Sequence, residues 1–354
     1  MIKSHKLEVS KCPSCGGNLK YDFTNKKVIC EYCGMEIEKN EIGKVKGKPL
    51  TEEEFENYSS WDWDSKTINC KSCGVSIELS KDNIVTFCPY CNSTNVIEIE
   101  EKEKQKRPDG IIPFSIDVEE CQSKLENWLN LHKVAPKEFL AGVKKEKPVG
   151  VFVPYWCFST DVEINYYKEI KDSSFSYRLE KAINKEIALE EKVHKKQFDE
   201  LLVSGSKYSE NGILDSISEY DFSKAVSYNY NYFNGFMAEK YSSGIENAWE
   251  EALAKMEPLI LEDLKTYISD FAAETIFEKT NIYNNTLFSQ YLLPVWITNY
   301  EDKEGKHIFV VNGQTGKVFG ECPVNYIKLL SKILGMAIGF LCLHYIFFGF
   351  DIGR

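Results

Sequence analysis

Eight of the twelve cysteines lie in Cys-x-x-Cys pairs, the arrangement that most often supplies thiolate ligands to a metal ion. Two pairs separated by 14 residues form one group of four, and a second group repeats the same spacing. Four such thiolates can surround one tetrahedral ion at about 2.3 Å from each sulfur. We therefore expect two tandem zinc ribbons, each holding one Zn²⁺, with the ligands Cys12, Cys15, Cys30, Cys33, Cys70, Cys73, Cys88 and Cys91.

The residue after each pair supports this interpretation. A Cys-x-x-Cys turn is followed by left-handed backbone, which glycine adopts freely and asparagine tolerates. Gly16, Gly34, Gly74 and Asn92 occupy the four positions. The chain between the pairs is short and poor in apolar residues, so burial alone cannot fold it. Metal binding must supply the difference, on the order of 10 to 16 kcal/mol for structural zinc.

The cysteines have two other possible uses besides zinc binding. Four thiolates also bind iron in rubredoxin-like sites, so iron stays an alternative. Disulfide pairs in a secreted module are disfavoured because no stretch resembling a signal peptide precedes the cysteines. A reducing compartment is therefore expected. The four remaining cysteines show no ligand-like spacing; they are Cys121, Cys157, Cys322 and Cys342.

The pattern of potential catalytic residues does not favour an enzyme. A site of four thiolates is closed and leaves no position for a reactive water. None of the five histidines lies beside a cysteine pair or in a His-Glu-x-x-His motif. An enzyme of unknown reaction working near Trp156 and Cys157 is kept as an alternative, although a small buried residue is the simpler interpretation of Cys157.

The charge of the chain bears on its partners. The formal net charge is −11, whereas proteins that clamp nucleic acid usually carry a basic excess. Nucleic acid is therefore a disfavoured partner, and a protein or peptide is expected instead. Binding of nucleic acid by the first ribbon remains the alternative, because that ribbon is locally basic at Lys11, Lys20, Lys26 and Lys27.

Composition divides the chain into six segments. A run of mixed charge that ends in Pro108 and Gly110 marks the boundary between the ribbons and the main domain. The expected segments are a first ribbon at 1–40, a linker at 41–66, a second ribbon at 67–100, a charged linker at 101–110, an α+β domain at 111–325 and a membrane anchor at 326–354.

The main domain is expected to be α+β with antiparallel strands. Apolar periodicity predicts a helix over 118–132, and residues 149–170 are rich in valine and aromatic residues, as strands are. The helical pattern of 242–277 contains Pro258, which favours two helices over one. Residues 307–321 read as a hairpin with turn residues in its middle. Residues 174–203 stay ambiguous, since a helix-like composition is flanked by extended segments.

The tail from Ile333 to Phe350 contains 18 residues without formal charge. As a helix it would extend about 27 Å, close to the roughly 30 Å of hydrocarbon in a bilayer. Lys328 and Lys332 precede it, and this positive bias favours a single-pass anchor with the N-terminal bulk in the cytoplasm. The alternative is a buried helix in a cytoplasmic protein. Gly335 and Gly339 form a GxxxG motif that would permit a homo-oligomer.

The chain resembles a bacterial family of uncharacterised membrane-anchored proteins with a transcription-factor-B type zinc ribbon. The motifs that carry this resemblance are CPSCGG, IIPF, APKEF, VPYWCF, FMAEKY with ENAWEEAL, LLPVW and VNGQTGKVFGE before a hydrophobic tail. The chain departs from the family in its two complete ribbons and its short tail. The resemblance implies an architecture and no reaction, so we expect a membrane-anchored, non-catalytic zinc-ribbon adaptor for a protein or peptide partner.

Overall fold

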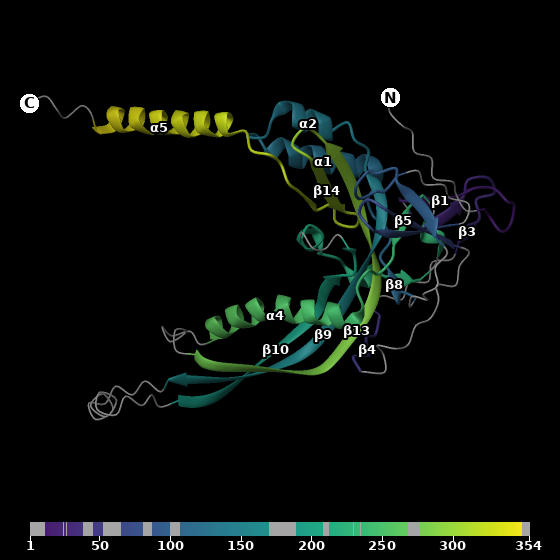
Figure 1. The fold of residues 1–354 in the computed structure, drawn as a ribbon, viewed down its shortest axis with the longest axis horizontal. Coiled ribbons are helices and arrows are strands. Elements are labelled where there is room, and N and C mark those ends of the chain that lie inside the picture. The colour runs from purple at the N-terminus through teal and green to yellow at the C-terminus, as the bar shows by residue number, and fades with distance from the viewer. Residues whose placement is uncertain are drawn as a thin grey trace, which may run out of the picture.

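Two long strands organise the structure (Figure 1). The computed structural model describes residues 11–23, 25, 27–37, 45–51, 65–80, 87–99, 107–169, 189–207, 212–228, 230–233, 235–267 and 276–348. Strand β9 (Val149–Glu169) pairs with β13 (Ile276–Glu301) in antiparallel register along most of their length. Valine and aromatic residues dominate β9, and the strand predicted there is confirmed.

A twelve-stranded sheet forms around this pair within the described residues. Its other members are β4 (Lys48–Pro49), β5 (Ser65–Cys70), β6 (Ser76–Ser80), β7 (Val96–Ile99), β8 (Gly110–Ile111), β10 (Leu189–Ser204), β11 (Val226–Ser227), β12 (Met237–Glu239), β14 (Lys306–Asn312) and β15 (Val318–Gly320). The pairs β12–β9 and β13–β8 are parallel. The α+β class is confirmed, but the sheet is mixed rather than antiparallel throughout.

The two cysteine groups occupy different sheets. The first lies with β1 (Leu19–Asp22), β2 (Lys27–Cys30) and β3 (Glu36–Ile37), which form a small antiparallel sheet of their own. The second lies on β5, β6 and β7, and β6 pairs with β12, so this group shares the main sheet. The predicted linkers at 41–66 and 101–110 fall largely on residues outside the described part of the chain.

Helices α1 (Val118–Leu131) and α2 (Lys137–Val143) lie beside β14 at one end of the sheet (Figure 1). The Asp117 carboxylate caps α1 by accepting the Glu120 N–H at 2.7 Å. The apolar face predicted for this helix is buried, with Cys121, Leu125 and Leu129 in the core. The helix predicted from periodicity over 118–132 is confirmed.

Helix α4 (Ile245–Tyr267) packs on β9 and β10 and continues through Pro258, so the prediction of two helices is wrong. The proline ring cannot donate to the Ala254 carbonyl, but both residues are exposed, and water can satisfy that carbonyl. The buried face continues across the proline through Met256 and Ile260. The described helix extends to Tyr267, residues 268–275 lie outside the described part of the chain, and β13 begins at Ile276, so the end of the predicted helical pattern is a strand.

Strand β10 occupies the described part of the segment left ambiguous at 174–203, while residues 170–188 lie outside the described residues. It pairs with β9 and contains a bulge between Phe198 and Leu201, where Glu200 has a φ of 56°. A second bulge, in β13, places Asn285 at a φ of 52° on the other side of β9. Bulges bend strands, and Figure 1 shows the arm of β9, β10 and β13 curving beneath α4.

The hairpin predicted at 307–321 is confirmed as β14 and β15. The Asn312 side-chain oxygen accepts the N–H groups of Gln314 and Thr315 at 2.8 and 2.9 Å, which fixes the turn. Gly316 has a φ of 76°, as the turn requires.

Helix α5 (Tyr326–Phe348) leaves the body after this hairpin and extends away from it (Figure 1). It is long and apolar enough to cross a membrane, and from Tyr326 to Tyr345 none of it is buried. The alternative of a helix buried in a core is therefore wrong. An apolar helix exposed in this way requires a lipid or protein environment to cover it.

Candidate metal centres

The four Cys-x-x-Cys turns share one backbone geometry. In each, the N–H of the residue after the second cysteine donates to the carbonyl of the first, at 2.8 Å for Gly16, 3.0 Å for Gly34, 2.7 Å for Gly74 and 2.9 Å for Asn92. Their φ values are 70°, 69°, 75° and 54°. The left-handed backbone predicted from the sequence at these four positions is confirmed. The turns aim both sulfurs of each pair at one centre.

The sulfur atoms of each group are close together. Within each set of four, all Sγ atoms lie within 4.8 Å of one another. In the first group Cys12 lies 3.7 Å from Cys33, and Cys15 lies 3.5 Å from Cys30. In the second, the corresponding Cys70–Cys91 and Cys73–Cys88 distances are both 3.6 Å. Two groups of four thiols that could hold metal ions are thus present.

These distances fit a tetrahedral ion. Four sulfurs about 2.3 Å from a central ion lie roughly 3.8 Å apart along each edge of the tetrahedron. A disulfide needs about 2.05 Å between its sulfurs, and all eight cysteines are free thiols. The disulfide alternative is therefore wrong for this structure. The donor set of four thiolates suits zinc and also accepts iron.

The first group lies at the molecular surface. Cys12 and Cys30 are buried, whereas Cys15 and Cys33 are exposed. Its small sheet is fastened to the body through Tyr21, whose hydroxyl donates to the Phe114 carbonyl at 2.9 Å. The buried residues of this sheet also belong to the same apolar cluster as residues of α1 and of the start of β9.

The second group is part of the protein core. Cys70 and Cys88 are wholly buried, and Cys91 is 9% exposed. Val75 and Ile77 from the same unit pack with Val151 and Tyr155 of β9 in one apolar cluster. If this group holds a metal ion, loss of the ion would therefore disturb the main sheet as well as the cysteine unit.

Two buried polar contacts join the second group to β12. The Tyr90 hydroxyl, between Cys88 and Cys91, donates to the Glu239 carboxylate, which also accepts the Ser206 hydroxyl at 2.8 Å. Burial raises the pKa of Glu239 to about 7, although these hydrogen bonds act in the opposite direction. Beside it, Lys240 forms an ion pair with Glu78 of β6. We call these contacts the polar seam; sequence reasoning missed it, because Glu78, Glu239 and Lys240 resemble surface residues of alternating strands.

Three of the four histidines in the described part of the chain make local contacts of their own. His194 lies 2.8 Å from Asp263, and His307 lies 3.0 Å from Asp302. The ring of His132 packs against Trp128 at the end of α1, with ring centroids 3.9 Å apart. None of these three histidines belongs to a metal-binding group found among the described residues.

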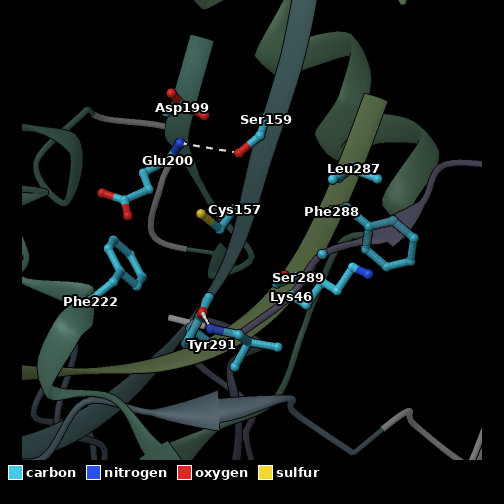
Figure 2. Close-up of a pocket in the computed structure, with 12 residues that line it drawn as sticks. Lys46, Cys157, Ser159, Asp199, Glu200, Phe222, Leu287, Phe288, Ser289 and Tyr291 are labelled. Atoms are coloured by element: carbon cyan, nitrogen blue, oxygen red, sulfur yellow. Dashed lines mark hydrogen bonds between the residues drawn. The ribbon is translucent and has the colours of Figure 1, made fainter. Parts of the chain in front are cut away.

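Cys157, the candidate nucleophile, lines a cavity of about 280 Å³ on one face of β9 (Figure 2). Its sulfur and the carboxylate of Glu200 face the same space, and the Phe222 ring borders it. The bulge in β10 brings Glu200 here, where its N–H donates to the Ser159 hydroxyl at 3.4 Å. Among the described lining residues none is a histidine, and the acidic groups are Asp199 and Glu200.

Comparison with known proteins adds one relative of full length. No family model matches the chain, and no solved structure matches it. The chain is 24% identical over 338 residues to the uncharacterized protein YdjG of Bacillus subtilis (strain 168). The alignment covers 93% of this chain and 94% of that protein, so the two are similar in their overall organisation along the sequence.

Proposed function

We propose that the protein is a membrane-anchored cytoplasmic adaptor whose two thiol groups are tandem zinc ribbons. In this proposal zinc has a structural role, α5 holds the chain in the bilayer, and the first ribbon presents a binding surface to a protein or peptide partner. The observation that carries the proposal is the combination of two closed groups of four thiols with an exposed apolar helix. A closed site favours a structural role over catalysis.

The surface best suited to a partner lies on the first ribbon. Tyr32, on the turn between Cys30 and Cys33, is 78% exposed, and a side chain added at Gly17 would meet its ring. Met35 is 38% exposed, and its sulfur lies 3.8 Å from that of Cys12. A tyrosine on a turn held by a metal loses little conformational freedom on binding, and tyrosine is enriched among residues that dominate interfaces.

Charged pairs surround this surface. Lys27 lies 2.7 Å from Glu36, and Lys20 lies 3.9 Å from Glu31. Protein interfaces commonly have an apolar centre and a polar rim of this kind. In these pairs a glutamate lies beside each lysine and offsets its positive charge. Binding of a nucleic-acid phosphate backbone, the alternative function, is therefore less favoured.

The test is capture of partners from native membranes with the full chain and a Tyr32→Ala variant. We expect the variant to lose on the order of tenfold or more in affinity for the main partner, as at a hot spot. Tyr267→Ala removes another exposed tyrosine, 61% exposed on α4, and should leave capture unchanged. If Tyr32→Ala and Tyr267→Ala capture the protein partner equally well, the first ribbon is not the binding surface. Salt-dependent capture of nucleic acid would favour nucleic acid as the partner instead.

A further inference from the structure

The first turn of α5 is attached to the connection between α1 and α2. The Asn325 N–H donates to the Val134 carbonyl at 3.0 Å, and the Lys328 ammonium donates to the Ala135 carbonyl at 2.8 Å. The Asn325 side chain also accepts the Lys328 N–H at 3.0 Å and so caps the helix. The start of α5 and this connection therefore form one continuous surface.

Helix geometry sets the depth of that surface relative to a bilayer. At 1.5 Å per residue, Lys328 lies about 7.5 Å before Ile333, where the uncharged run begins. The polar region on each side of the hydrocarbon is roughly 5 to 8 Å thick. When α5 spans the membrane, as the proposed function requires, the Ala135 carbonyl bonded to Lys328 lies at the level of the lipid headgroups.

The connection and α2 are basic, although the chain as a whole carries a net charge of −11. Residues 131–147, which we call the basic shelf, contain five lysines and two glutamates. The Lys144 ammonium donates to the Asn130 side chain at 2.8 Å, which places the end of α2 beside the end of α1. Lys133 and Lys137 lie within two residues of Ala135, whose carbonyl binds α5, and the other lysines of the shelf follow at the end of α2; they are Lys144, Lys145 and Lys147.

The basic shelf also contains one strongly exposed apolar side chain. Leu131 is 76% exposed at the end of α1, three residues before the carbonyl that binds Asn325. On α5, Ile327, which directly precedes Lys328, is 82% exposed. Exposed apolar side chains among lysines are typical of surfaces that enter the interface of a membrane with their apolar groups and keep their charges at the headgroups.

We infer that the basic shelf is a binding site for anionic phospholipid headgroups. Lysines attract the negatively charged cytoplasmic leaflet within a Debye length of about 10 Å, and the shelf lies within that distance when α5 is inserted. Leu131 enters the interface, while Lys133 and Lys137 contact phosphate. Two attachments, α5 and the shelf, then fix the orientation of the sheet and the ribbons relative to the membrane.

The test uses the full chain in lipid nanodiscs of phosphatidylcholine with or without phosphatidylglycerol, and it measures hydrogen exchange of residues 131–147. We expect slower exchange in the discs that contain phosphatidylglycerol. The variant Lys133→Glu/Lys137→Glu should abolish this difference. The variant Lys20→Glu/Lys27→Glu changes the net charge equally on the first small sheet and should retain it.

The two readouts test membrane insertion of α5 and lipid binding by the basic shelf separately. Incorporation of the chain into discs reports on α5 alone, so failure of incorporation would overturn the anchoring and the shelf with it. Incorporation with equal exchange in both kinds of disc would overturn the shelf alone. That second result is the one expected if the lysines bind an acidic protein instead of lipid.

Discussion

Lys240 and Glu78 form an ion pair that is almost completely removed from solvent, with exposed side-chain fractions of 6% and 2%. Thr67 donates a further hydrogen bond to Glu78 at 3.1 Å. An ion pair in such surroundings contributes little net stability, because both charges lose their hydration. Removal of one partner is costly, since the other charge stays buried. The polar seam therefore fixes how the second cysteine group joins β12.

Lys240→Ala is expected to lower the free energy of unfolding by about 3 to 5 kcal/mol, because Glu78 remains buried without its cation. Denaturant unfolding in detergent measures this change. Lys317→Ala serves as the matched control, since Lys317 and Glu219 form a pair at 2.6 Å whose side chains are 42% and 75% exposed. That control should change stability by roughly 1 kcal/mol or less. Equal effects of the two variants would contradict the structural role of the seam.

Among the strands, the start of β9 is tightly packed against aromatic rings. Phe114 and Phe236 stack with centroids 4.2 Å apart, and a side chain added at Gly150 would collide with this pair. Gly150→Ala is therefore expected to destabilise the fold by roughly 1 to 3 kcal/mol. Thermal unfolding of the variant measures the effect.

Gly244→Ala is the control for that substitution. A side chain added at Gly244 meets nothing within 4 Å, and Gly244 precedes α4 at the cap position, where alanine is only slightly less favourable than glycine, so this variant should cost less than about 1 kcal/mol. If Gly150→Ala proves as harmless as this control, the packing described at the start of β9 is incorrect.

The elements that could be predicted from sequence are those with a strong local signal. The periodic apolar positions of α1, the valine-rich run of β9 and the turn residues between β14 and β15 all determine structure locally. The spacing of the cysteines likewise located both thiol groups, because the Cys-x-x-Cys turn has its own backbone geometry.

The elements that could not be predicted depend on distant contacts. The composition of β10 resembles that of a helix, but the segment forms a strand. The edge of β9 supplies hydrogen-bond partners along the length of β10, and this tertiary contact outweighs the local preference. Helix α4 tolerates Pro258 because the apolar face on either side packs on the sheet. Strand β12 is only three residues long, yet it joins β6 to β9, and no local signal predicts such a connection.

At the scale of the whole molecule, the proposed membrane location depends on α5, which is long and apolar enough to cross a bilayer. We expect the full chain to sediment with membranes and to resist alkaline extraction, because α5 buries an uncharged run in the hydrocarbon. Deletion of Ile333 to Phe350 should release the protein into the soluble fraction, as fractionation followed by immunoblotting would detect. Recovery of the intact chain among soluble proteins would contradict the anchoring.

The central claim concerns the two groups of four thiols, and metal analysis of the purified full chain tests it most directly. The account predicts two equivalents of metal per chain, with zinc rather than iron. Cys15→Ser should lose one equivalent while the main sheet stays folded, since the first group lies at the surface. Cys70→Ser should lose one equivalent and lower the unfolding temperature, because Cys70 is wholly buried in the shared core. A folded chain that contains fewer than two equivalents of any metal would contradict the account.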